Sequence, residues 1–203
     1  MISVESRCRW QPKQERTMRL KTFFLFSFWC CITPVLSAQG TAKDYLPWSN
    51  VRKLTVDDFV IKTKSLESTS SFAQFTITFE SIGFGFFTKN FNKKVHNYFL
   101  PGASWIDTTT DVAQSLRYQQ TLFDLAEIYT RQMRKALREN RSQFLKNGNL
   151  VTDLNNQFMA AFANRRVAYD SETRFGTNAV MQEAWETQIQ KELAALADFS
   201  YDR

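Results

Sequence analysis

The chain has 203 residues, with 26 lysines and arginines, 20 aspartates and glutamates and a single histidine. Six of the basic residues and two of the acidic ones lie in residues 1–38, so residues 39–203 carry a formal net charge of only +2. This small excess gives no electrostatic reason to expect nucleic-acid binding. All three cysteines also lie in residues 1–38, which excludes a disulfide, a thiolate nucleophile or a cysteine-ligated metal in residues 39–203.

Residues 18–38 have the three parts of a secretory signal peptide: a basic start, an apolar stretch and small residues at its end. We therefore predict a leader over residues 1–38, with Met18 as the true start and cleavage near Ser37–Gly40. The apolar stretch is short for a membrane span, and Pro34 interrupts it. The predicted protein is secreted or periplasmic, with no membrane span after the leader is removed. An uncleaved anchor and a lipoprotein are the alternatives.

Residues 39–203 are interpreted as one domain whose first part consists of strands. Residues 53–62 and 70–80 are rich in β-branched and aromatic residues, a pattern typical of strands. Residues 82–99 predict a hairpin that turns near Asn92–Lys93. The 15 phenylalanines of residues 39–203 give this domain enough apolar surface for a core that needs no disulfide.

The second part of the domain predicts three helices. A capping residue at Asp111 and a glycine stop at Asn147–Gly148 indicate one long helix, with a bend near Glu139–Asn140. Two shorter helices are predicted over residues 152–166 and 178–197. Strands followed by helices indicate an α+β fold, in which N-terminal antiparallel strands pack against three C-terminal helices.

Residues 116–136 of the long helix look like the helix of a zinc protease without its zinc ligands. A helical HExxH site needs two histidines one turn apart on one face and a glutamate beside them as general base. The corresponding positions here are Tyr118, Gln119 and Leu122, and the one histidine, His96, lies outside this helix.

Short segments along residues 39–203 occur in an order that matches a known family. They are Trp48, Leu54–Phe59, Ser104–Trp105, Phe123–Leu125, Glu127–Arg131, Lys135–Arg138, Tyr169–Gly176 and Gln182–Trp185. In this order the chain resembles an uncharacterised bacterial family of secreted zinc-dependent proteases that carry an HEQxHFD-type helix. The resemblance implies a zincin-like fold in which the long helix carries the metal site.

The chain departs from this family at the positions that carry its chemistry. The resemblance aligns the family's two helical histidines with Tyr118 and Leu122, its glutamate with Gln119 and a later histidine with Phe175. Leucine and phenylalanine have no lone pair for zinc, a neutral phenol is a poor ligand, and an amide does not accept the proton of an attacking water. We therefore expect no catalytic residue, no metal and no cofactor. Tyr118, Leu122 and Phe175 are expected to form a small apolar patch in the core or on the floor of a groove.

Three acidic residues close to this lost site are candidates for other chemistry. Asp124, Asp170 and Glu172 could bind a hard cation such as calcium or serve in a rebuilt hydrolytic site. The preferred interpretation is structural, with Asp124 and Asp170 capping helices or holding the loop before the third helix.

Basic and aromatic clusters also have structural interpretations. The basic residues of the long helix predict a solvated face interleaved with acidic residues, and the alternative is a docking face for an anionic glycan or a protein. The aromatic residues of the hairpin predict core packing, and the alternative is a sugar-stacking platform. His96 is interpreted as a surface or hydrogen-bonded residue. The basic residues are Arg131, Arg134, Lys135, Arg138 and Arg141, and the aromatic residues are Phe84, Phe86, Phe87 and Phe91.

The sequence thus predicts a secreted, catalytically inactive zinc-protease-like protein that acts in binding or as a scaffold. Its predicted partner is a protein, a peptide or a glycan of the cell envelope. Two alternatives stay open at this point: a hydrolase with a rebuilt carboxylate-based site, and a glycan-binding module that uses the aromatic hairpin.

Overall fold

The chain divides into two units, Met1–Ala38 and Gln39–Arg203. The computed structural model describes only residues of the second unit, namely 45–62, 69–80, 91–143 and 146–203. The predicted leader therefore lies outside the described residues and stays a prediction. Within the described ranges, no helix is both long enough and apolar enough to cross a lipid bilayer.

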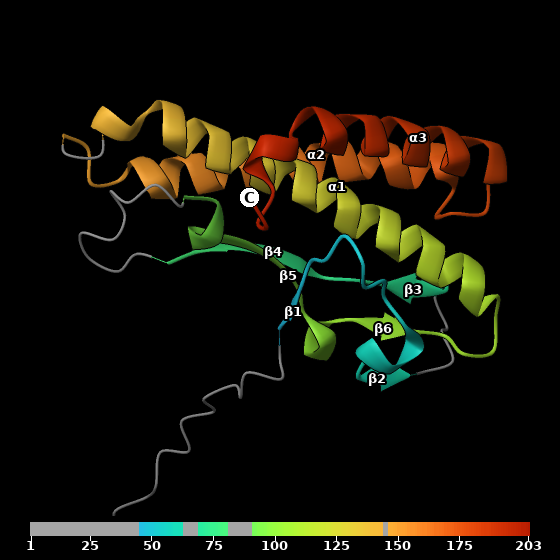
Figure 1. Ribbon diagram of the computed structural model, residues 1–203. Helices are drawn as coiled ribbons and strands as arrows, with labels where there is room; N and C mark the ends of the chain where they lie inside the picture. The colour runs from blue at the N-terminus through green and yellow to red at the C-terminus, as the bar shows by residue number, and fades with distance from the viewer. Residues whose placement is uncertain (1–44, 63–68, 81–90, 144–145) are drawn as a thin grey trace, which may run out of the picture. The chain divides into compact units, whose positions relative to one another are not determined.

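The described part of the chain has an α+β fold, as predicted, with short strands first and three helices afterwards (Figure 1). The strands are β1 Leu46–Pro47, β2 Ile61–Lys62, β3 Ser71–Phe72, β4 Phe75–Phe79, β5 Val95–Phe99 and β6 Trp105–Ile106, and the helices are α1 Val112–Glu139, α2 Leu150–Thr173 and α3 Ala179–Ala195.

The strands form two three-stranded sheets. In the first sheet β5 is central and pairs antiparallel with all five residues of β4, but β1 pairs with only its last two residues, Tyr98 and Phe99. In the second sheet β6 is central, antiparallel to β3 and parallel to β2. The parallel pair departs from the antiparallel arrangement predicted for the strands. Parallel pairing requires a long connection, and residues 63–104 provide it.

Most of the first predicted strand is not a strand. Val56–Asp58 forms a turn of 3-10 helix that begins after Thr55, and only Ile61–Lys62 extends into a sheet. The carboxylate of Asp58 accepts hydrogen bonds from the backbone N–H and the hydroxyl of Thr55. Such local bonds compete with strand pairing, which explains why the hydrophobic pattern alone predicted the wrong structure here.

The starts of two helices agree with the prediction, but two ends do not. Asp111 caps α1 by accepting a hydrogen bond from the backbone N–H of Gln114, and Asn178 caps α3 in the same way. Helix α1 ends at Glu139, where a bend was predicted, because the side-chain amide of Asn140 donates to the carbonyl oxygen of Ala136. Helix α2 continues past its predicted end to Thr173 and stops at left-handed backbone.

Helix α1 packs against the strands and also against the other two helices (Figure 1). It is therefore buried on nearly every side from Tyr118 to Arg134, not along one apolar stripe. On the strand side, the ring of Phe123 stacks on Phe75 with 5.0 Å between ring centroids. On the helix side, α1 packs against both α2 and α3. A helix in this position must bury the polar residues of its sequence together with the apolar ones.

The prediction of a solvated basic face on the long helix is wrong for the first two of the five basic residues assigned to that face. Arg131 and Arg134 are buried, and both donate to the buried Glu127 carboxylate, at 3.1 and 2.8 Å. The other N–H groups of Arg134 donate to the carbonyl oxygens of Val95 and Phe199. Lys135 and Arg138, by contrast, are exposed as predicted. Arg141 is exposed too. The buried group, which we call the Glu127 cluster, consists of Glu127, Arg131 and Arg134.

Replacement of Arg134 by alanine should destabilise the protein strongly. The Arg134→Ala variant leaves Glu127 with one partner fewer and two carbonyl oxygens without their donor, so we expect a loss of about 3–5 kcal/mol in the free energy of unfolding. Urea denaturation measures this loss. The neighbouring Lys135→Ala variant is the control and should change stability by less than about 0.5 kcal/mol. Equal effects of the two substitutions would contradict a structural role for the Glu127 cluster.

Candidate functional site

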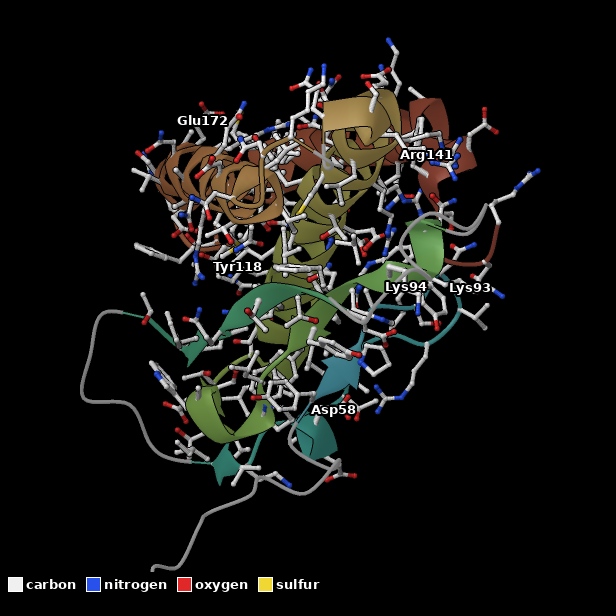
Figure 2. All side chains as sticks on the ribbon, turned by 90° about the vertical axis from the view of Figure 1, so that its left-hand side faces the viewer. Asp58, Lys93, Lys94, Tyr118, Arg141 and Glu172 are labelled. Atoms are coloured by element: carbon white, nitrogen blue, oxygen red, sulfur yellow. The ribbon has the colours of Figure 1, made fainter. Side chains whose placement is uncertain are left out.

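Three of the four positions aligned with a zinc site lie inside the protein. Tyr118 and Leu122 are buried one turn apart on α1, as predicted. The ring of Tyr118 stacks on Tyr169 of α2 at 5.2 Å, and its hydroxyl donates to Asp170 Oδ1. Figure 2 shows Tyr118 on the inner side of the helices, whereas Glu172 lies on their outer surface. The tyrosine hydroxyl, which the sequence left without a partner, is therefore satisfied.

Phe175 does not join the core, contrary to the expected apolar patch. Its side chain is 43% exposed, and its backbone has a φ of 55°, in the left-handed region. Its ring meets the ring of Tyr118 only edge-on, with 6.4 Å between the two centroids. Gly176 occupies the inner position, where a Cβ atom would lie 2.7 Å from the Cβ of Tyr118. The glycine is thus required both by its φ of 84° and by this close approach.

Gln119, which stands where the family has its glutamate, is fully buried and points toward β3. Its side-chain nitrogen donates to the hydroxyl oxygen of Ser71 at 3.0 Å. Its side-chain oxygen has no hydrogen-bond partner among the described residues. The contact fixes the amide as a hydrogen-bond donor to the sheet, which is a structural use of this position.

Asp124 does not cap a helix, so that interpretation is wrong. It lies in the middle of α1 and accepts hydrogen bonds from the indole N–H of Trp48 at 2.8 Å and from the side chains of Gln120 and Gln190. Burial raises the pKa of Asp124, and the hydrogen bond from Trp48 acts in the opposite direction. Asp124 therefore joins the segment after β1 and helix α3 to the central helix.

The other two acidic residues have separate partners. Asp170, in the last turn of α2, receives the hydroxyl of Tyr118 and lies 3.6 Å from the guanidinium of Arg166. Glu172 is exposed and accepts a hydrogen bond from the indole N–H of Trp185. In the part of the chain that the structure describes, no three His, Cys, Asp or Glu side chains come together as a possible metal site. The three carboxylates do not form one cluster.

A pocket of about 290 Å³ lies elsewhere, beside β5. The pocket forms where β1 stops pairing with β5. Pro47 is the last residue of β1 and pairs with Tyr98, and the chain then leaves β5 at Trp48. The backbone N–H of Trp48 still donates to the carbonyl oxygen of Asn97. Helix α1 and the last residues of the chain close the other sides. The lining residues are Pro47, Trp48, Ser49, His96, Asn97, Tyr98, Glu127, Arg134, Tyr201 and Asp202.

The walls of this pocket are polar and aromatic. The ring of His96 stacks on Tyr98 at 5.4 Å and meets Tyr201 at 5.3 Å, and its Nε2 atom is 3.3 Å from Glu80 Oε1. Asn97 is buried and donates to the carbonyl oxygen of Phe123, but its side-chain oxygen has no partner among the described residues. Burial lowers the pKa of Arg134, while the carboxylate of Glu127 acts against this shift.

Sequence reasoning missed this pocket because its residues come from four distant segments. Glu127, Arg131 and Arg134 lie four and seven residues apart on α1, a spacing that places them on one helical face. This spacing could have suggested an ion cluster, but nothing in the sequence indicated that the face is buried. The aromatic hairpin stays a prediction, because Phe84, Phe86 and Phe87 lie outside the described residues.

No protein-family model, curated protein or solved structure matches this chain. The resemblance to secreted zinc-dependent proteases therefore rests on the sequence motifs alone and stays a prediction. The α+β arrangement is a property of the structure itself, whereas its likeness to zincins is not supported by any of these comparisons.

The Asp170→Asn substitution should change how stability depends on pH. Burial raises the pKa of Asp170, although the hydrogen bond from Tyr118 and the charge of Arg166 lower it in part. The folded state thus holds this proton more tightly than the unfolded chain, so the contribution of Asp170 is most favourable below about pH 4 and is lost as the pH rises through its folded pKa. The stability of the wild type relative to Asp170→Asn should therefore fall as the pH rises above about 4.

Urea denaturation of both proteins at several pH values tests this trend. The control is Asp153→Asn, which changes an exposed carboxylate in the first turn of the same helix. Because this control removes the same charge at an exposed position, a difference between the two substitutions isolates the effect of burial at Asp170. A relative stability that rises with pH for Asp170→Asn would show that hydrogen bonding outweighs burial at this site.

Proposed function

We propose that this protein is a secreted, catalytically inactive relative of zinc proteases that acts in binding or as a scaffold. The observation that carries the proposal is the packing at the aligned positions. Tyr118 and Leu122 are 2% and 0% exposed, and the backbone of Gly176 lies directly against the tyrosine. A hydrolytic zinc centre needs imidazole, thiolate or carboxylate ligands and an open position for water. Leu122 has no zinc-binding atom, and Tyr118 offers only a neutral phenol, which is a poor zinc ligand.

The position of the general base supports the same proposal. Removal of a proton from water needs a group with a suitable pKa within hydrogen-bond reach of that water. Gln119 is an amide, and it is buried and bonded to Ser71. An ionisable residue at this position would have to be buried next to the sheet, at a considerable desolvation cost.

The alternative of a rebuilt carboxylate site has less support. A pair of carboxylates that shares one reaction must face one substrate, but Asp124, Asp170 and Glu172 each bond to a different set of side chains. Asp124 and Asp170 are also mostly enclosed by their partners. The proposal includes export, which the predicted leader implies. It also includes a partner in the cell envelope, which is a protein, a peptide or a glycan.

The metal content and the hydrolytic activity of the purified chain test this proposal. We expect no stoichiometric metal after purification without chelator and without a histidine tag, and no cleavage of unstructured protein substrates with or without added zinc. A bound ion near one per chain together with proteolysis that a chelator abolishes would overturn it. The Asp124→Ala variant then distinguishes a site that uses this carboxylate from a contaminating protease.

Restoration of the aligned residues tests the relationship to zinc proteases. A variant with Tyr118→His, Gln119→Glu, Leu122→His and Phe175→His should bind about one zinc ion per folded chain, because three imidazoles form a typical catalytic ligand set. Atomic absorption measures the metal, and circular dichroism confirms the fold. The control carries only Gln119→Glu and Phe175→His and should bind none. A folded fourfold variant without zinc would remove the support for this ancestry.

A further inference from the structure

The pocket beside β5 offers a ligand hydrogen-bond acceptors more than free cations. Arg134 donates four internal hydrogen bonds, two to Val95 and one each to Glu127 and Phe199. Arg131 likewise donates to Glu127 and to the carbonyl oxygen of Leu193. An anionic ligand would have to compete with these internal acceptors. The arginines of the Glu127 cluster therefore hold the fold together and do not form an open anion site.

The acceptor groups of the pocket, unlike its arginine donors, are not fully engaged by internal hydrogen bonds. Asn97 is only 3% exposed, and its side-chain oxygen has no partner among the described residues. Both hydrogen bonds that Glu127 accepts from arginine end on the same oxygen, Oε1. Asp202 adds a carboxylate at the rim. A buried acceptor without a partner costs free energy, and a ligand that donates to it recovers this loss.

Aromatic rings form the remaining walls, and two of them are held in place. The indole of Trp48 is fixed by its hydrogen bond to Asp124, and the Arg131 guanidinium lies over the ring at 5.2 Å. Tyr98 is fixed by its stacking on His96. Tyr201, which is 39% exposed, completes the wall from the end of the chain. Rings that are already ordered add contact area to a ligand at a small entropic cost.

We propose that this pocket binds a single neutral sugar ring, with the unpartnered side-chain oxygen of Asn97 accepting from a sugar hydroxyl. A sugar offers several O–H donors together with a C–H face, which matches acceptors placed beside Trp48, Tyr98 and Tyr201. The volume of about 290 Å³ lies at the lower end of the range for small-molecule sites and suits one ring. The inference rests on the proposed binding function and names its ligand class and its site.

Titration of the full chain with methyl glucoside, methyl galactoside, methyl mannoside and N-acetylglucosamine tests the proposal. We expect saturable binding of at least one of them, measured by calorimetry and by saturation-transfer NMR. Inorganic phosphate and butylammonium chloride are the contrasting probes. Binding of phosphate or butylammonium at this pocket without any binding of the sugars would overturn the sugar assignment, and so would the failure of all four sugars to bind.

Substitutions at the wall decide whether a bound sugar occupies this pocket. Tyr201→Ala changes an exposed ring, and Asn97→Leu removes the buried acceptor, so each should weaken binding about tenfold or more. Asn97→Leu also removes a hydrogen bond to Phe123, so its fold is checked by thermal denaturation. Tyr201→Ala carries the test if that variant does not fold. The control is Phe175→Ala, an aromatic ring of similar exposure that does not line the pocket and should bind sugar as the wild type does.

The outcomes separate this inference from the proposed function. Sugar binding that is weakened by Phe175→Ala and not by Tyr201→Ala would place the ligand elsewhere and overturn the inference. A metal-free, inactive chain that binds no sugar overturns the inference and leaves the proposed function in place. Metal-dependent proteolysis overturns the proposed function, and the titrations then still measure directly whether the pocket binds sugar.

Discussion

The buried carboxylate of Glu127 is the constraint on which the arrangement of the layers depends. A charge inside a protein is tolerated only when it is paired and hydrogen-bonded. Here two arginines of the same helix supply the pairing, and their other N–H groups bond to the carbonyl oxygens of Val95 in β5, Leu193 in α3 and Phe199 near the end of the chain. The same contacts that neutralise the charge therefore hold the strands, the central helix and the end of the chain together (Figure 1).

Helix α1 separates two places with different chemistry. Toward α2, Tyr118 and Leu122 are buried at the positions that the sequence resemblance aligns with zinc ligands, and Asp170 accepts the tyrosine hydroxyl. Toward β5 and the end of the chain, Glu127 and Arg134 line the pocket of about 290 Å³. Trp48 lines this pocket, and its hydrogen bond to Asp124 joins the pocket wall to the middle of helix α1.

The packing around Tyr118 makes both favourable and unfavourable contributions to the free energy of folding. Stacking of Tyr118 on Tyr169 and complete burial of Leu122 contribute apolar contact without the desolvation of charged ligands. The side-chain oxygen of Gln119, in contrast, is buried without a partner among the described residues, which costs free energy. The site is thus not a fully apolar patch, since an amide is retained there for its bond to Ser71.

The sequence by itself determined the features that depend on neighbouring residues. Asp111 and Asn178 cap helices because a side chain bonds to a backbone N–H only three positions away. The order of strands and helices and the absence of histidine from the long helix are equally visible in the sequence. Only the tertiary structure decided that Arg131 and Arg134 are buried, that Phe175 is exposed and that Asn97 borders a pocket. Periodicity identifies the apolar face of a helix, but the burial of a charge depends on partners such as Val95 and Phe199, and their distance along the chain leaves no local pattern.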